Sequence, residues 1–224
     1  TRTVRVPEPI SHGIAAGQSW LVLEYLSLVG DGARAMERLG RQLAALHAQP
    51  RPGFGWHRDN TIGATPQPNA YCDDWIEFWR TQRLGFQLNL AARNGYAGTL
   101  QQQGEQLQAR LDGLFVGCQP TPALLHGDLW GGNAGCTVDG EPVIFDPAVY
   151  QGDREADLAM TELFGGFPES FYAAYREALP LSVGYPQRRT LYNLYHILNH
   201  LNLFGGSYRA QAEQMIAQLL AELR

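Results

Sequence analysis

Residues 124–133 read Leu-Leu-His-Gly-Asp-Leu-Trp-Gly-Gly-Asn, and they carry more information than any other part of the chain. Asp128 and Asn133 stand five positions apart in this glycine-rich stretch. Thirteen residues after Asn133, an apolar segment ends in Phe-Asp-Pro and supplies Asp146. Three side chains with oxygen atoms therefore follow one another in a pattern of strand, loop and hairpin.

The spacing Asp-x-x-x-x-Asn occurs in the catalytic loop of kinases, where the aspartate receives the proton of the acceptor hydroxyl and the asparagine holds a metal ion. Mg²⁺ prefers oxygen ligands, usually one or two carboxylates together with phosphates and water. The pattern predicts that Asp128 is the catalytic residue and that Asn133 and Asp146 bind Mg²⁺. The alternative is that Asp128 and Asn133 are ordinary turn residues. The strands expected at 122–125 and 142–146, with a hairpin turn between them, favour the phosphoryl-transfer site.

The residues around this motif resemble the fructosamine kinase (ketosamine-3-kinase) family, within the wider aminoglycoside phosphotransferase and choline kinase-like group. The resemblance rests on residues 125–133, 145–148 and 152–160, with further matches at 65–69, 164–168 and 198–205. It implies an α+β, protein kinase-like fold, with ATP and Mg²⁺ as cofactors. It also implies that residues 1–26 are the remnant of an N-terminal sheet lobe with the interlobe hinge, and that residues 27–224 form a helical C-terminal catalytic lobe.

The resemblance implies roles for four further residues. The carbonyl of Glu24 and the amide of Leu26 would contact adenine, although these residues could also be a plain strand end. Asp157 would accept hydrogen bonds from the backbone of the catalytic loop, or it is a carboxylate favoured at a helix start. His126 is interpreted as a scaffold of that loop and not as a base.

Trp130 lies two positions after Asp128, inside the loop that must face the acceptor. An indole packs well against the apolar face of a sugar ring, so Trp130 is a candidate substrate-binding residue. The alternative is a core anchor that holds the catalytic loop in place.

The implied substrate is a ketosamine, either a small molecule or a sugar adduct on protein lysines, and the implied reaction phosphorylates a sugar hydroxyl, with deglycation repair as a possible purpose. The sequence does not distinguish fructosamine from ribulosamine. Two alternatives stay open: another kinase of the same fold, acting on an aminoglycoside, choline or a sugar, and a truncated module without catalysis.

All 17 basic residues are arginines, and the chain starts at Thr1. Kinases of this fold use a glycine-rich loop and a strand lysine to hold the ATP phosphates. Neither occurs in this sequence, so we expect both to lie upstream of Thr1 in a longer protein. We expect the present chain alone to be inactive.

Composition is typical of a soluble enzyme. The net charge is −5 and no basic stripe indicates nucleic acid. No apolar run approaches the roughly 20 residues of a membrane span. Three widely separated cysteines argue against a disulfide framework and favour the cytoplasm. The oligomeric state is left open.

Apolar spacing predicts the following elements: a strand at 20–26, a helix at 33–49, a long loop at 50–69, helices at 71–94 and 99–115, and mainly helix after Arg154 with breaks at Pro168, Pro180 and Pro186. His196 and His200 lie four apart on one expected helix, but their apolar and aromatic surroundings favour packing over metal binding.

Overall fold

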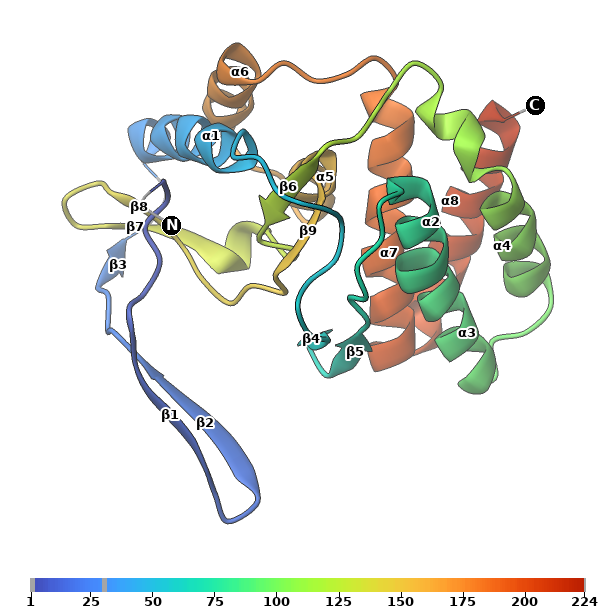
Figure 1. The fold of residues 1–224 in the computed structure, drawn as a ribbon, viewed down its shortest axis with the longest axis horizontal. Coiled ribbons are helices and arrows are strands. Elements are labelled where there is room, and N and C mark those ends of the chain that lie inside the picture. Colours follow the sequence, from blue (N-terminus) through green and yellow to red (C-terminus); the bar gives the residue numbers. More distant parts are fainter. Residues whose placement is uncertain (1–2, 30–31, 224) are drawn as a thin grey trace.

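The structure, a computed structural model, describes residues 3–29 and 32–223. Its helices are Ala33–His47 (α1), Trp75–Phe78 (α2), Phe86–Arg93 (α3), Thr99–Ala109 (α4), Glu155–Leu163 (α5), Glu169–Ala178 (α6), Tyr185–Phe204 (α7) and Arg209–Glu222 (α8). Figure 1 shows α1 and α6 together on one side of a group of short strands, with α2, α3, α4, α7 and α8 on the other side. The fold is therefore mixed, as expected, and the strands lie between two helical groups.

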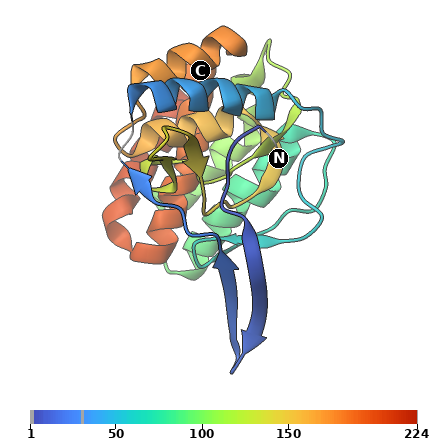
Figure 2. The ribbon, with the colours of Figure 1, turned by 90° about the vertical axis from the view of Figure 1, so that its left-hand side faces the viewer.

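Two strands form a hairpin that projects from the body in both Figure 1 and Figure 2: β1 (Pro9–Ala15) and β2 (Gln18–Leu23). Ala16 and Gly17 at its tip have φ angles of 51° and 77°, as the common two-residue hairpin turn requires. The strand expected at 20–26 is present but ends earlier, at Leu23. Leu23 pairs with Pro9, which has no N–H group to donate to the ladder, although beyond this pair the N–H of Glu24 still donates to the carbonyl oxygen of Glu8 at 2.8 Å.

The central strands are β3 (Leu28–Val29), β6 (Pro122–Leu125), β7 (Ala134–Thr137), β8 (Pro142–Ile144) and β9 (Tyr150–Asp153). β6 pairs antiparallel with β9, and β7 lies between β3 and β8. The strand expected at 122–125 and the hairpin before residue 142 are confirmed. The second strand stops at Ile144, which leaves Asp146 just outside the ladder. β6 and β7 thus carry the two ends of the loop at 126–133.

The segment at 50–69 is not simply a loop, because it contains a small hairpin of β4 (Asn60–Ile62) and β5 (Thr65–Gln67). The prediction of a long loop was therefore wrong for residues 60–67. The hairpin is held by buried amide side chains, which leave no apolar alternation in the sequence. By contrast, α1 confirms the helix expected at 33–49, and its Leu39 and Leu43 side chains are fully buried.

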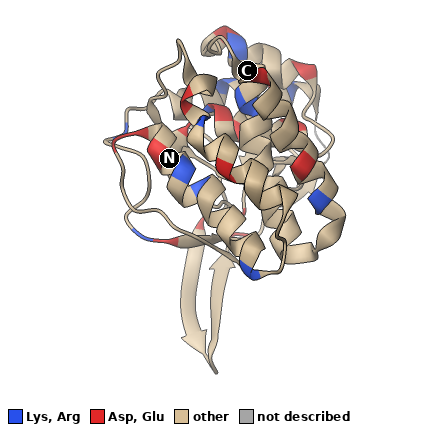
Figure 3. Ribbon diagram, turned by 90° about the vertical axis from the view of Figure 1, so that its right-hand side faces the viewer, with Lys and Arg blue, Asp and Glu red and all other residues tan. Residues whose placement is uncertain are grey.

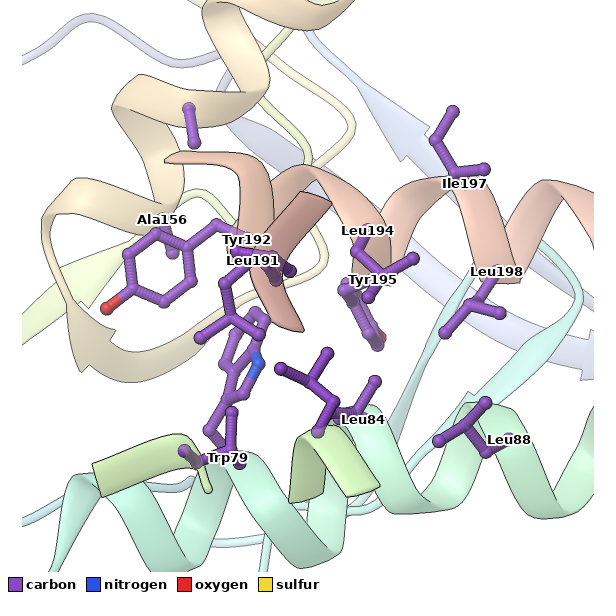
Figure 4. Packing of buried hydrophobic residues seen from close by; sticks show 14 of the residues in the cluster. Trp79, Leu84, Leu88, Ala156, Leu191, Tyr192, Leu194, Tyr195, Ile197 and Leu198 are labelled. Atoms are coloured by element: carbon purple, nitrogen blue, oxygen red, sulfur yellow. The ribbon is translucent and has the colours of Figure 1, made fainter. Parts of the chain in front are cut away.

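The helix expected at 71–94 is present from Trp75 to Arg93, with a π-helical segment at Trp79–Gly85 between α2 and α3. The helix expected at 99–115 is present as α4, but it ends at Ala109 and is followed by a short 3-10 helix at Leu111–Phe115. Figure 4 shows how this region packs: Trp79, Leu84 and Leu88 face the side chains of α7. Pro186 does not break a helix, because it lies in the first turn of α7. Proline is tolerated there, since that turn has no internal partner for its N–H.

Basic and acidic positions are interspersed over the helical face in Figure 3. In the part of the chain that the structure describes, no helix is both long enough and apolar enough to cross a membrane.

Candidate functional site

The loop at 126–133 connects β6 to β7 and is shaped by Gly127. Its φ angle is 83°, and a Cβ atom at this position would lie 2.1 Å from the carbonyl oxygen of Ala148. Only glycine fits both conditions. The close approach brings the loop against the chain that follows Asp146, so two segments separated in sequence form one site.

Asp128, Asn133 and Asp146 come together at one end of the strands. The Nδ2 atom of Asn133 donates to the main-chain oxygen of Asp128 at 2.9 Å and lies 3.4 Å from both the Oδ2 atom of Asp128 and the main-chain oxygen of Asp146. The main-chain N–H of Phe145 donates to the carbonyl oxygen of Asn133 at 3.1 Å. All three predicted site residues line one open cavity of about 340 Å³.

Asp128 is suited to accept a proton. Burial, together with the charges of Asp146 and Asp157, raises the pKa of Asp128 to about 6, although the hydrogen bond from Asn133 acts in the opposite direction. A carboxylate with such a pKa is ionised at neutral pH and still basic enough to take a proton from a hydroxyl group during transfer.

Asp146 adopts a left-handed backbone conformation with a φ angle of 56°. Aspartate tolerates this conformation better than most residues, but it still costs about 1 kcal/mol. Strain of this kind persists only where the surroundings impose it. The side chain of Asp146 is exposed at the cavity, so the carboxylate is available to a ligand.

The chemistry of these side chains fits a hard cation. In the described residues, no group of three or more His, Cys, Asp or Glu side chains could hold a metal ion alone. Mg²⁺ does not need such a cage, because it commonly takes one or two protein oxygens and completes its shell with phosphate and water. The Asp146 carboxylate and the amide oxygen of Asn133 can supply these protein oxygens.

Asp157 is fully buried and is bound to the start of the loop. Its Oδ2 atom accepts from the main-chain N–H of His126 at 2.7 Å, and its Oδ1 atom accepts from that of Gly127 at 2.8 Å. The Nε2 atom of His47 lies 3.2 Å from Oδ2, and the Nδ1 atom of His47 lies 2.9 Å from the Tyr175 hydroxyl. Burial alone would raise the pKa of Asp157, but the hydrogen bonds and charges around it hold the pKa below its ordinary value.

His126 has its own contacts, and His47 is an unexpected member of the group. The Nε2 atom of His126 lies 2.9 Å from the carbonyl oxygen of Phe145, and burial lowers the pKa of His126. His47 lies on the buried face of α1. Its polar partners lie 110 and 128 positions away, so nothing in its local sequence indicated them.

Replacing Asp157 with asparagine is expected to lower the free energy of unfolding by about 3 kcal/mol or more at pH 7, because a buried charged network loses one partner. The pKa of Asp157 is depressed in the folded state. The stability that it contributes is therefore present above the unfolded carboxyl pKa of about 3.9 and is lost as the pH falls through the lower folded pKa. Urea unfolding at several pH values should show a gap between wild type and variant that narrows in acid.

Asp153→Asn is the matched control for that measurement, because Asp153 is also buried but burial raises its pKa to about 6. A carboxyl group whose pKa is raised by folding contributes stability at pH values below its unfolded pKa. This stability is lost as the pH rises through the folded pKa of about 6. The gap between wild type and Asp153→Asn should thus change with pH in the opposite direction. Equal pH profiles for the two variants would contradict the assignment of Asp157.

Aromatic side chains also line this cavity. Trp130 contacts Phe164 edge to face at 6.2 Å between ring centroids, and Phe164 contacts His200 at 5.1 Å. Tyr208 stacks on His200 at 5.2 Å. Trp130 is 39% exposed, so it is not a fully buried anchor. His200 lines this cavity, whereas its neighbour on α7, His196, is buried, and burial lowers the pKa of His196 to about 3.

A second, apolar cavity of about 420 Å³ lies between the hairpin β1–β2 and the strands. Its lining includes Leu21 and Leu23 on one side, Ile144 and Val149 on the other, and Asp146 where it approaches the first cavity. The described side chains that line it do not include Glu24 and Leu26, which follow β2 directly.

Glu24 is held by three contacts next to this cavity. Its main-chain N–H donates to the carbonyl oxygen of Glu8 at 2.8 Å, and its Oε2 atom accepts from the N–H of Glu8 at 3.1 Å. Its Oε1 atom pairs with Arg5. The side chain of Glu24 is therefore committed to the adjacent segment.

Comparison with known proteins gives a consistent result. The family model described as fructosamine kinase matches residues 1–222. The chain is 54% identical over 221 residues to a probable ketoamine kinase of Synechocystis, covering 98% of this chain and 74% of that protein. It is 45% identical over 227 residues to the chloroplastic protein-ribulosamine 3-kinase of Arabidopsis thaliana, covering 100% of this chain and 69% of that protein.

Solved structures agree with the sequence comparison. A putative fructosamine-3-kinase from Haemophilus somnus superposes with a TM-score of 0.87 at 32% identity, covering 98% of this chain and 75% of the other. A gentamicin complex of the phosphotransferase APH(2")-IIa has a TM-score of 0.58 at 11% identity, covering 98% of this chain and 74% of the other, which shows a shared fold alone. The expected aminoglycoside phosphotransferase-like fold is confirmed.

Proposed function

Because this chain belongs to the fructosamine kinase family, we propose that it carries the catalytic site of an ATP-dependent kinase that phosphorylates a sugar hydroxyl of a ketosamine. The proposal rests on one observation: Asp128, Asn133 and Asp146 line a single cavity together with aromatic side chains. Relatives named as ketoamine kinase and protein-ribulosamine 3-kinase support the substrate class.

Each of the three polar residues has its own proposed role in phosphoryl transfer. We assign the binding of Mg²⁺ to the Asp146 carboxylate and the Asn133 amide oxygen, where the ion would neutralise phosphate charge. We assign the proton of the attacking sugar hydroxyl to Asp128, because its pKa is raised and its carboxylate lines the aromatic cavity. His126 and Asp157 hold the loop that carries Asp128, and they act through it without touching the reacting atoms.

The apolar cavity is the proposed nucleotide site. Leu21, Leu23 and Val149 offer apolar surface to the two faces of adenine. The carbonyl of Glu24 and the amide of Leu26 would supply the hydrogen bonds at the adenine edge. Asp146 lines both cavities, which supports a nucleotide whose phosphates point from the apolar cavity toward the acceptor.

The aromatic cavity is the proposed acceptor site. Trp130 and Phe164 present apolar ring surface, while Asp128 offers an acceptor for a hydroxyl group. Sugars have this division between an apolar C–H face and polar edges. The cavity is open to solvent at its aromatic side, which is compatible with a ketosamine on a free amine or on a protein lysine.

The test uses the full-length protein, Mg-ATP and either fructosyl-lysine or ribulosyl-lysine. We expect ADP release that depends on the ketosamine, with a phosphorylated product visible by mass spectrometry. Choline and an aminoglycoside serve as comparison acceptors. Turnover with either of them but not with a ketosamine would overturn the substrate class, and folded protein that releases no ADP with any acceptor would overturn the kinase assignment.

Replacing Trp130 with alanine is expected to raise KM for the ketosamine roughly threefold to tenfold, because a well-placed aromatic contact contributes ~0.5–1.5 kcal/mol. KM for ATP and the melting temperature should stay nearly unchanged, since Trp130 is partly exposed. Steady-state kinetics with both substrates, together with thermal melts, make the measurement. A large drop in melting temperature with unaltered kinetics would instead identify a structural anchor.

We also propose a reducing compartment, the cytoplasm, as the site of action. Cys72 and Cys118 form no disulfide, and structural disulfides are rare in reducing compartments.

A further inference from the structure

The small hairpin of β4 and β5 contacts the chain immediately after Asp146, although it lies about 80 to 90 positions earlier in the sequence. The Nε2 atom of Gln67 donates to the carbonyl oxygen of Ala148 at 3.1 Å. The Nδ2 atom of Asn60 donates to the carbonyl oxygen of Val149 at 2.8 Å. Two consecutive peptide groups are therefore held by two amide side chains from one hairpin.

These amides are themselves held in one orientation. The Oδ1 atom of Asn60 accepts from Gln67 at 2.9 Å and from Asn69 at 2.8 Å, and the Oε1 atom of Gln67 accepts from the Tyr195 hydroxyl at 2.8 Å. Gln67 and Asn69 are 1% and 0% exposed. A buried amide with its donors and acceptors all paired has little freedom to rotate.

A buried guanidinium fixes the hairpin to the helical core. Arg83 donates to the Oδ1 atom of Asn69 at 2.7 Å and to the carbonyl oxygen of Pro68 at 2.6 Å. Its charge lies over the ring of Tyr150 at 4.0 Å and that of Phe78 at 4.6 Å. Tyr150 is the first residue of β9 and directly follows Val149. Arg83 therefore contacts both the segment after β5 and the strand next to the carbonyl groups that Gln67 and Asn60 bind.

The other side of Asp146 is held as well. The N–H of Phe145 donates to Asn133, and the carbonyl oxygen of Phe145 is bound by His126. Asp146 thus lies between two fixed points and carries the left-handed φ angle of 56°. The peptide group before Asp146 and the carbonyl group of Ala148, two residues after it, are both fixed, and Pro147 between them has a restricted φ angle. The backbone at Asp146 therefore has few conformations left, which limits the directions that its carboxylate can take.

We propose that Asn60 and Gln67 are positioning residues for the metal-binding carboxylate of Asp146. The inference rests on the proposed function, which assigns the metal ion to Asp146. It gives the stretch Thr-Pro-Gln-Pro-Asn at 65–69 a role: Gln67 holds the carbonyl group of Ala148, two residues after the proposed metal ligand, and Asn69 orients Asn60. Neither Asn60 nor Gln67 lines the cavity that would hold the ion, so they act only through the backbone.

The experiment measures Mn²⁺ affinity in the presence of ADP by electron paramagnetic resonance, with full-length protein. Gln67→Leu removes the donor to Ala148 while keeping a side chain of similar size. Asn60→Asp removes the donor to Val149 but keeps the oxygen that Gln67 and Asn69 bind, and it serves if Gln67→Leu does not fold. Outer partners of metal ligands typically contribute 10- to 100-fold in affinity. We expect each variant to weaken Mn²⁺ binding about tenfold or more.

Gln101→Leu is the matched control. The Nε2 atom of Gln101 likewise donates to two main-chain oxygens, those of Leu88 and Tyr96, but it lies in the helical group away from Asp146. We expect this variant to lower the melting temperature without changing Mn²⁺ affinity by more than about twofold, well below the tenfold loss expected for Gln67→Leu and Asn60→Asp.

Two outcomes separate the inference from the proposed function. If Asp146→Ala abolishes Mn²⁺ binding while folded Gln67→Leu and Asn60→Asp bind Mn²⁺ as wild type does, the hairpin is only structural and the inference is wrong. If Asp146→Ala itself binds Mn²⁺ as tightly as wild type, the assignment of the metal site fails first.

Discussion

Replacing Asp146 with alanine is expected to abolish Mg²⁺-dependent turnover. Asp146 is the one exposed carboxylate that lines both the apolar and the aromatic cavity among the described residues. Without it, the metal ion keeps only the Asn133 amide as a protein ligand, and the charge on the transferred phosphate is no longer balanced. The measurement is ADP release as a function of Mg²⁺ concentration in the full-length protein.

Because Asp146 has a left-handed backbone conformation, a second substitution at this position is needed to separate loss of the ligand from backbone strain. Alanine is disfavoured at a φ angle of 56°, so Asp146→Ala combines loss of the ligand with backbone strain. Asp146→Gly removes the same carboxylate but accepts the conformation. We expect both variants to be inactive, with Asp146→Gly the more stable of the two. Substantial turnover by Asp146→Gly would show that the carboxylate is not the metal ligand.

Asp139→Ala is a control on another exposed acidic residue. Asp139 lies in the turn between β7 and β8 and is exposed. Its removal changes the net charge by the same amount as the removal of Asp146. We expect nearly normal turnover and an unchanged Mg²⁺ dependence, so any general effect of charge on activity would be visible in this variant.

Asp128→Ala is expected to lower turnover by ~10²–10⁴, the contribution typical of a general acid–base group. The effect should fall on kcat more than on KM, because proton transfer occurs in the transition state. Single-turnover kinetics with saturating ketosamine and Mg-ATP measure it directly. Near-normal rates would remove Asp128 from the mechanism.

Asp128→Ala is expected to keep or raise the thermal stability of the protein, although it lowers turnover. Burial raises the pKa of Asp128 to about 6, which means that the ionised carboxylate is held in an unfavourable place at neutral pH. Its strongest side-chain contact, with Asn133, is long at 3.4 Å. We therefore expect Asp128→Ala to melt at the same temperature as wild type or higher, as is common for residues kept for activity. A clearly lower melting temperature would indicate a structural role.

Several elements followed from the sequence because their signals are local. The apolar spacing of α1 predicts its buried face, and Leu39 and Leu43 are buried accordingly. The strand at 122–125, the loop and the turn before residue 142 follow one another along the chain, so short-range pairing brings Asp128, Asn133 and Asp146 together. The resemblance to fructosamine kinases rests on the same stretch, and the family match confirms it.

The shape of the segment at 50–69 could not be predicted in the same way. Its hairpin is stabilised by amide side chains that bind main-chain oxygens of a distant strand. Such bonds depend on where two segments meet, and polar residues of this kind are equally common in loops. The early end of β2 also depends on another segment, because β2 ends opposite Pro9, the first residue of its partner strand.

The sequence by itself determined the family, the fold class and the order of the three polar residues, because these depend on residue types at short spacing. Only the tertiary structure decided the surroundings of that site. His47, Asn60 and Gln67 reach it across 80 to 130 positions, and Phe164, His200 and Tyr208 add aromatic surface to the cavity from later parts of the chain. Long-range hydrogen bonds and aromatic contacts leave no periodic pattern in a chain, since they form only when packing brings separate elements into contact.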